Sequence, residues 1–122
     1  MTEKKYKELI DEVSTEFDTF REQMLQKTKQ EIFDEFYRIA VYNDFVDFFF
    51  NEGINLNNKG LPKKNILQDV YNEFMATSYD LTEEGKYFFM EDYINDNIKY
   101  KRFKDKEICL WQTNNMMIFA LN

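Results

Sequence analysis

Apolar residues recur at helical spacing along most of this chain. In the segment 4–26 they advance by steps of four, three, four, three and four residues, and such steps place side chains on one face of a helix. The residues on this stripe are Tyr6, Ile10, Val13, Phe17, Phe20 and Met24, with Leu9 beside them. The segment therefore predicts a long amphipathic helix with a narrow apolar stripe.

The stripe of this first helix has two interpretations. It can pack against the rest of the same chain, which is the simpler arrangement. A stripe sustained for nearly three heptads can also form the seam of a coiled coil between copies. We therefore keep a candidate oligomer face on it, and its residues are Val13, Phe17, Phe20 and Met24.

A second helix is expected to begin at Thr28, because Thr28 and Glu31 have the spacing of a capping box. Its buried face would use Ile32, Phe36, Ile39 and Ala40. If this helix ran on unbroken, the aromatic run that follows would turn away from that face and Asn43 would point inward. The pattern therefore predicts a break or sharp kink between Tyr42 and Asp44, with Asn43 as the N-cap of a new helix.

The new helix would bury Phe45, Phe48 and Phe49 and leave Phe50 exposed beside Asp47. Gly53 is expected to end it in the left-handed conformation, and Ile54 would then fold back onto Phe49.

Two further helices are predicted after the polar connector 54–65. The first uses an apolar face of Ile66, Leu67, Val70, Tyr71 and Phe74. The second begins at either Asp80 or Thr82, both of which are good N-cap residues. Its inward side would hold Tyr87, Phe88, Met90, Tyr93 and Ile94.

The C-terminal segment has a different pattern. The runs "IKYKRF", "EICLWQ" and "MMIFAL" are short and β-prone, and Asn114-Asn115 is a suitable hairpin turn. The expected fold class is therefore α+β: four to five helices followed by a C-terminal antiparallel β-hairpin or three-stranded sheet. We expect a single domain over residues 1–122, with a helical body at 1–97 and a β-rich part at 98–122.

Composition supports a packed core and limits the location of the protein. The 122 residues include 13 Phe, 8 Tyr and one Trp, with only 3 Gly and 1 Pro. No apolar run reaches the length of a membrane span, and the N-terminus lacks the pattern of a signal peptide. A single cysteine, Cys109, cannot form an internal disulfide, so we expect a protein of the cell interior.

The sequence offers no recognisable catalytic chemistry. It contains no histidine, which removes Ser-His and Cys-His catalysis and most zinc sites. Cys109 stands in an apolar run and is interpreted as a small buried residue. We therefore expect no enzyme, no catalytic residue, no metal site and no cofactor.

Charge is uneven along the chain. The net charge is −7; residues 1–98 hold 21 acidic and 11 basic side chains (net −10), whereas residues 99–122 hold 2 acidic and 5 basic (net +3). An acidic body argues against direct nucleic-acid binding, which depends on surplus cations, and suits a partner with a basic surface. The candidate acidic partner-binding residues are Glu83, Glu84, Glu91, Asp92 and Asp96.

A cluster of positive charges follows, at Lys99, Lys101, Arg102, Lys104 and Lys106. It can touch nucleic acid or an acidic groove. Alternatively, it is the polar edge of a strand, where lysines discourage edge-to-edge pairing.

Three segments resemble a group of small uncharacterised proteins of phages and mobile elements in low-GC Gram-positive bacteria. They are "MTEKKYKELIDEV", "KQEIFDEFYRIAVYNDFVDFF" and "LQDVYNEFMATSYD". The resemblance implies a protein of the bacterial host cytoplasm that binds a host protein, since some neighbours of this kind inhibit CRISPR nucleases or restriction enzymes. The leading hypothesis is therefore an anti-CRISPR-type inhibitor of a Cas9-type nuclease that acts by protein–protein contact.

Two other functions stay open. One is an accessory structural homo-oligomer, such as a homodimer, built on the stripe of the first helix. The other is a nucleic-acid-binding regulator that uses the basic C-terminal hairpin.

Overall fold

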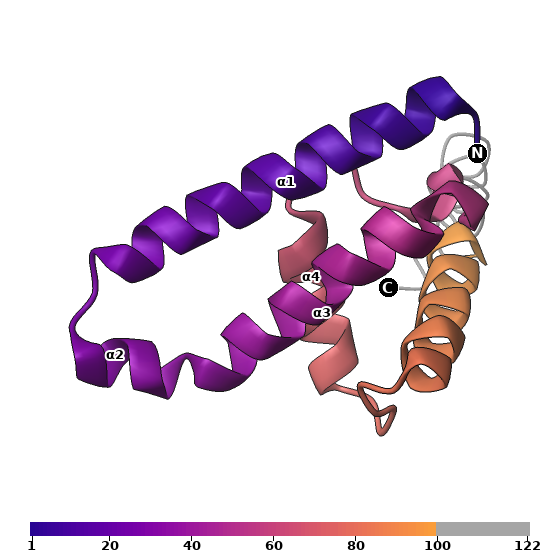
Figure 1. The fold of residues 1–122 in the computed structure, drawn as a ribbon. Coiled ribbons are helices and arrows are strands. Elements are labelled where there is room, and N and C mark those ends of the chain that lie inside the picture. The colour runs from indigo at the N-terminus through magenta and orange to yellow at the C-terminus, as the bar shows by residue number, and fades with distance from the viewer. Residues whose placement is uncertain (100–122) are drawn as a thin grey trace, which may run out of the picture.

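The computed structural model describes residues 1–99, and within these residues the chain is helical and contains no strand. The α-helices are α1 (Glu3–Leu25), α2 (Lys29–Asp34), α3 (Phe36–Glu52), α4 (Ile66–Met75) and a helix over residues 83–99. Short 3-10 turns occupy Gly53–Asn55 and Asn58–Gly60. In Figure 1, α1 and α3 run in opposite directions, α4 crosses behind α3, and the 83–99 helix stands at the end where α3 finishes.

The predicted α+β fold class is wrong for the residues that the structure describes. The helix that begins at residue 83 continues through Ile98 and Lys99, where the sequence pattern predicted the first strand. The physical reason is that Ile98 follows Ile94 by four residues, so it stays on the helix face that packs against the core. The remaining residues of the predicted hairpin, 100–122, lie outside the described residues.

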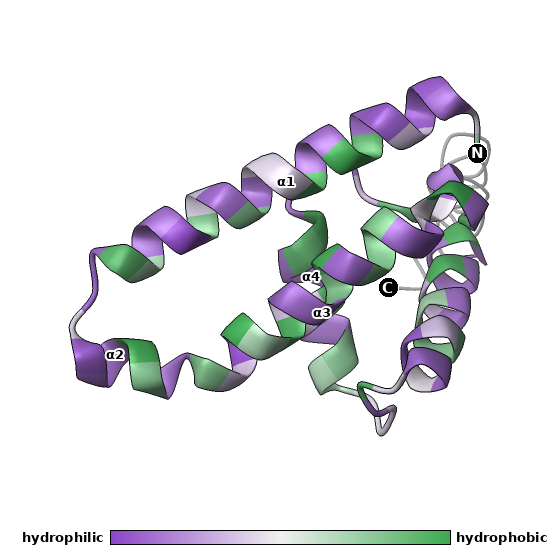
Figure 2. Cartoon of the chain, in the orientation of Figure 1, coloured by the Kyte–Doolittle hydropathy of each residue, from purple (hydrophilic) through white to green (hydrophobic). Residues whose placement is uncertain are grey.

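The first helix is confirmed. The Thr2 hydroxyl caps it by accepting from the backbone N–H of Lys5 at 3.2 Å. Figure 2 shows α1 mostly purple with isolated green turns, as a narrow apolar stripe requires. The stripe residues that it buries are Leu9, Val13, Phe20 and Met24.

The capping box at Thr28 and Glu31 is also confirmed, but the helix that it starts ends after six residues. The chain breaks at Glu35 and not between Tyr42 and Asp44, so the predicted kink is wrong. Asn43 is exposed in the middle of α3 and caps nothing. An asparagine inside a helix costs less than about 1 kcal/mol, whereas a second break would leave up to four N–H and four C=O groups without partners.

The break at Glu35 resets the helical phase. From there α3 turns a single broad face inward, formed by Val41, Tyr42, Phe45, Val46, Phe48 and Phe49. The predicted burial of Phe45, Phe48 and Phe49 and the exposure of Phe50 are therefore confirmed. The predicted buried face at the start of this region is wrong at Phe36, which is 67% exposed, whereas Ile32, Ile39 and Ala40 are half-buried and Ile39 packs against the core.

The end of α3 also differs from the prediction. Gly53 has φ −58° and ψ −34°, so it is right-handed, and Ile54 is exposed. Gly53 is closely packed, since a Cβ built on it would lie 3.1 Å from Cε1 of Tyr6. The turn is held to the start of α1, where the Met1 amino group donates to the Ile54 carbonyl oxygen at 2.8 Å.

The core of the described chain is an aromatic cluster between α3, α4 and the 83–99 helix. Phe45, Phe74 and Phe89 meet edge to face, with ring centroids 5.2–5.7 Å apart. Edge-to-face pairs add to the stabilisation from burial alone. In α4 the predicted face is confirmed, with Ile66, Leu67, Val70 and Phe74 buried.

Thr82 is the N-cap of the 83–99 helix, and its hydroxyl accepts from the backbone N–H of Gly85 at 3.0 Å. The predicted burial of Met90, Tyr93 and Ile94 is confirmed, but the fourth aromatic or apolar residue on the inward side is Phe89. Tyr87 and Phe88, which were predicted to be core, are 50% and 51% exposed.

Candidate interaction surface

The predicted acidic residues all lie on the 83–99 helix and all are exposed: Glu83, Glu84, Glu91, Asp92 and Asp96. They do not form one stripe. Glu84 and Glu91 are two turns apart and share the centre of the outward face. Asp92 and Asp96 follow one border of that face, and Glu83 stands at the first turn, 3.6 Å from the ammonium of Lys86.

Two aromatic side chains lie among these carboxylates. The rings of Tyr87 and Phe88 are 6.0 Å apart between centroids, and both are about half exposed. Tyr87 and Phe88 stand between Glu84 and Glu91 along the helix. We call the set Glu84, Tyr87, Phe88 and Glu91 the acidic-aromatic face.

The sequence analysis missed this pair because it assigned both aromatic residues to the core. The inward side instead takes Lys86, which is the buried charged residue among those that the structure describes. Lysine is rarely buried, so spacing alone did not favour it. Its aliphatic stem lies inside while its ammonium reaches Glu83.

The helix that carries the acidic-aromatic face is fixed at three points. The Asn97 amide donates to the Gly60 carbonyl oxygen at 2.9 Å, and the Tyr93 hydroxyl donates to Asp69 on α4. Burial, together with the hydrogen bond to Asp69, raises the pKa of Tyr93 above its ordinary value. Gly60 meets Ile94 so closely that a Cβ on it would lie 2.7 Å from the Ile94 carbonyl oxygen.

The segment before the helix is pinned as well. The Tyr79 hydroxyl donates to the carboxylate of Asp92, and this bond raises the pKa of Tyr79. Asp80 accepts from the backbone N–H of Thr82, and hydrogen bonds from Thr82 hold the pKa of Asp80 below its ordinary value. These contacts fix the residues that precede the helix. The bond from Tyr79 also occupies part of the hydrogen-bond acceptor capacity of Asp92.

The predicted basic residues are mostly beyond the described chain. Lys99 is exposed at the end of the helix. Lys101, Arg102, Lys104 and Lys106 lie outside the described residues, as does Cys109.

The candidate oligomer face on α1 is largely occupied by contacts within the chain. Val13 is fully buried, and Phe20 and Met24 are 5% and 9% exposed. Phe17 is half-buried. The ring of Phe20 packs against Tyr42 of α3 with centroids 4.5 Å apart.

A polar cluster joins α1, α3 and α4 beside Phe20. The Arg38 guanidinium lies 5.1–5.6 Å from the ring centroids of Phe20, Tyr42 and Tyr71, which is cation–π distance. It also donates to the Gln68 side chain. The cluster ties α3 to α4 and accounts for the partial burial of a charged residue.

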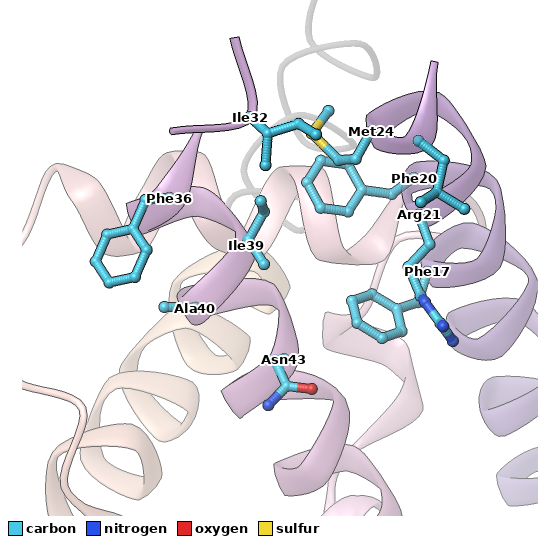
Figure 3. A pocket seen from close by; sticks show the side chains of 10 residues that line it. Phe17, Phe20, Arg21, Met24, Ile32, Phe36, Ile39, Ala40 and Asn43 are labelled. Carbon is cyan, nitrogen blue, oxygen red and sulfur yellow. The ribbon is translucent and has the colours of Figure 1, made fainter. Parts of the chain in front are cut away.

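An apolar groove of about 390 Å³ opens between the C-terminal half of α1 and the α2–α3 segment. Figure 3 shows Phe17, Phe20 and Met24 on the α1 side and Ile32, Phe36, Ile39 and Ala40 on the other. Leu25, on the rim, is 72% exposed. This groove was not predicted, because it depends on where α2 lies relative to α1.

The structure shows no helix within residues 1–99 that is long and apolar enough to cross a membrane. Among the same residues, no group of three or more Cys, Asp or Glu side chains is placed to hold a metal ion.

Comparison of the chain with protein-family models, with curated proteins and with solved structures finds no match. The resemblance to mobile-element proteins therefore stays an expectation from the sequence.

Proposed function

We propose that this protein is a non-enzymatic binding protein of a phage or mobile element that inhibits a host defence nuclease of the Cas9 type. It would act by covering a basic nucleic-acid-binding surface of the nuclease. The observation that carries the proposal is the acidic-aromatic face, an exposed pair of rings flanked by carboxylates on a firmly held helix.

The chemistry of the face suits a basic protein surface. Aromatic side chains supply much of the binding energy at protein interfaces, because they bury a large area with few rotatable bonds. Glu84 and Glu91 can accept hydrogen bonds from arginine and lysine side chains that otherwise contact phosphates. Carboxylates beside the rings also repel acidic partners, which narrows the choice of partner.

The order of the helix adds to affinity. A surface that is already fixed loses less conformational entropy on binding than a mobile one. Thr82 caps the start of the helix, and Tyr93 in the middle and Asn97 near the end hold it to the rest of the chain.

The test is binding and inhibition with Cas9–guide RNA complexes from low-GC Gram-positive bacteria. The double variant Tyr87→Ala, Phe88→Ala should weaken binding by about tenfold or more, because each truncated anchor costs on the order of 1–2 kcal/mol. The double variant Glu84→Lys, Glu91→Lys should slow association and reduce its dependence on salt.

A matched control is available on α1. Asp11 and Asp18 are exposed and seven residues apart, like Glu84 and Glu91, so Asp11→Lys, Asp18→Lys makes the same change in net charge elsewhere. It should leave inhibition nearly unchanged. If no complex binds, or if cleavage is unaffected by the protein, the proposal is wrong; direct, steeply salt-dependent binding to DNA would instead favour the nucleic-acid-binding regulator.

A further inference from the structure

The most exposed large apolar side chains of the described chain lie together around α2. The three most exposed large hydrophobic residues are Phe33 (74%), Leu25 (72%) and Phe36 (67%) among residues 1–99. Leu25 and Phe36 line the apolar groove, and Phe33 is on α2, one residue after Ile32, which also lines it. Protruding rings and an open hollow are thus next to each other. We call this region the α2 patch.

The area of the α2 patch is larger than isolated surface residues explain. At these exposed fractions, the three side chains leave on the order of 400 Å² of apolar surface. Half-buried groove residues, Phe17, Ile32 and Ile39, add to it. That total reaches the size of the largest apolar patches on monomers and a substantial part of the roughly 800 Å² per partner of a standard interface.

We infer that the α2 patch is a dimer interface that binds a second copy of this chain. A two-fold interface needs a surface that is complementary to itself, so that each copy supplies both a projection and a hollow. The α2 patch has both: Phe33 projects from α2 and Phe36 from the start of α3, and the groove lies beside them. In the dimer, α2 of each copy lies against the groove of the other.

Charges at the α2 patch favour the same occupant. Arg21 lines the groove, and it makes no ion pair or hydrogen bond within the described part of the chain. Arg21 is exposed, and a partner that places a carboxylate beside its guanidinium matches the charge of the groove. The α2 helix carries Asp34 directly after Phe33, so a second copy brings the carboxylate together with the ring.

This charge pattern also separates the α2 patch from the surface of the proposed function. An arginine at the groove disfavours a basic nuclease surface there, whereas the acidic-aromatic face favours one. The α2 patch is formed by α1, α2 and the start of α3, whereas the acidic-aromatic face is on the 83–99 helix. A dimer would therefore present two acidic-aromatic faces.

The test is the molar mass of the full-length chain in solution from micromolar concentration upward, by sedimentation equilibrium and light scattering. The expected result is a dimer. Leu25→Ser and Phe33→Ser should each raise its dissociation constant about tenfold or more, and both residues are exposed, so thermal unfolding at low concentration should change little. Phe88→Ser is the matched control, since Phe88 is an exposed aromatic residue on a different helix and should leave the mass unchanged.

A charge exchange identifies the occupant. Arg21→Asp and Asp34→Arg should each weaken the dimer, and the double variant should recover most of the loss, because the pair is then restored between copies. A chain that stays monomeric at the highest concentration overturns the inference, since the α2 patch would then be covered within the chain or by a different protein. The inference is also overturned if neither Leu25→Ser nor Phe33→Ser raises the dissociation constant of the dimer. Nuclease inhibition by dissociated variants is measured separately, so failure of the proposed function is distinguishable from failure of the dimer.

Discussion

The N-terminus of α4 is capped by a residue from a different helix, and removing that residue gives the sharpest stability prediction. Asn65, at the N-cap position, has φ 54° and makes no side-chain capping hydrogen bond within the described residues. The carboxylate of Glu16 on α1 takes over this task. It accepts from the backbone N–H of Leu67 at 2.8 Å and of Gln68 at 2.9 Å.

Glu16→Ala should therefore destabilise the protein by about 2 kcal/mol. Loss of an N-cap costs about 0.5–2 kcal/mol, and two partly buried N–H donors lose a charged acceptor here. Burial of the carboxylate opposes part of its benefit, which keeps the figure from being larger. For a chain of this length, the change corresponds to a fall in Tm of roughly 6–10 °C.

Glu16→Gln separates the hydrogen bonds from the charge. Its amide retains one acceptor oxygen, so we expect a smaller loss than with alanine. Burial raises the pKa of Glu16 above its ordinary value of 4.5, against the opposing effect of the backbone hydrogen bonds. The folded state then binds the proton more tightly than the unfolded state, so the wild type should lose stability relative to Glu16→Gln as the pH rises from 4.5 through the raised pKa.

The assay is urea unfolding at several pH values, together with hydrogen exchange at Leu67 and Gln68. Glu22→Ala is the control, because Glu22 is exposed on the same helix and makes the same change in side chain. The exchange measurement should show lost protection at the start of α4 only in the Glu16 variants. If Glu16→Ala matches Glu22→Ala within about 0.5 kcal/mol, the tertiary cap is not a significant source of stability.

Three further predictions follow from the packing. Gly60→Ala should lower the free energy of unfolding by about 2–4 kcal/mol, because the new Cβ would lie 2.7 Å from the Ile94 carbonyl oxygen. Thermal unfolding measures this, and a variant with the wild-type Tm would contradict the close approach. Phe45→Ala should cost about 3–5 kcal/mol, whereas Phe50→Ala should stay within about 1 kcal/mol, and equal losses in urea unfolding would contradict the orientation of α3. The pKa of Glu31 lies below its ordinary value because of its capping hydrogen bonds, so its contribution is present above pH 4.5 and is lost as the pH falls through the lowered pKa. Carboxyl NMR titration checks this, and an ordinary pKa would refute it.

The apolar pattern predicted which helices form better than it predicted which way they face. Phe45, Phe48 and Phe49 were placed in the core correctly, but through a kink at Asn43 that does not exist. The error arose because the break at Glu35 carries no glycine or proline that would mark it. One residue of irregular backbone there changes the direction of every side chain that follows.

The acidic-aromatic face was predicted only in part, again because the sequence did not decide which way the residues of a helix face. Its carboxylates were named from the sequence, since exposed acidic residues are easily recognised. Tyr87 and Phe88 were not, because a run of Tyr, Phe, Phe and Met offers two helical phases of similar apolar content. The contact of Phe89 with Phe45 and Phe74 selects one phase and turns the other pair outward.

What the sequence by itself determined is therefore local: the amphipathic first helix, the capping box at Thr28, the apolar face of α4 and the excess of negative charge. These features depend on residues within a few turns of one another, where spacing and hydrogen-bonding capacity are enough to decide the outcome. Only the tertiary structure decided the phase of the 83–99 helix, the cap that Glu16 provides for α4 and the groove beside α2. Each of these depends on which side chains meet across tens of residues, and the free energy of that contact is absent from any local pattern.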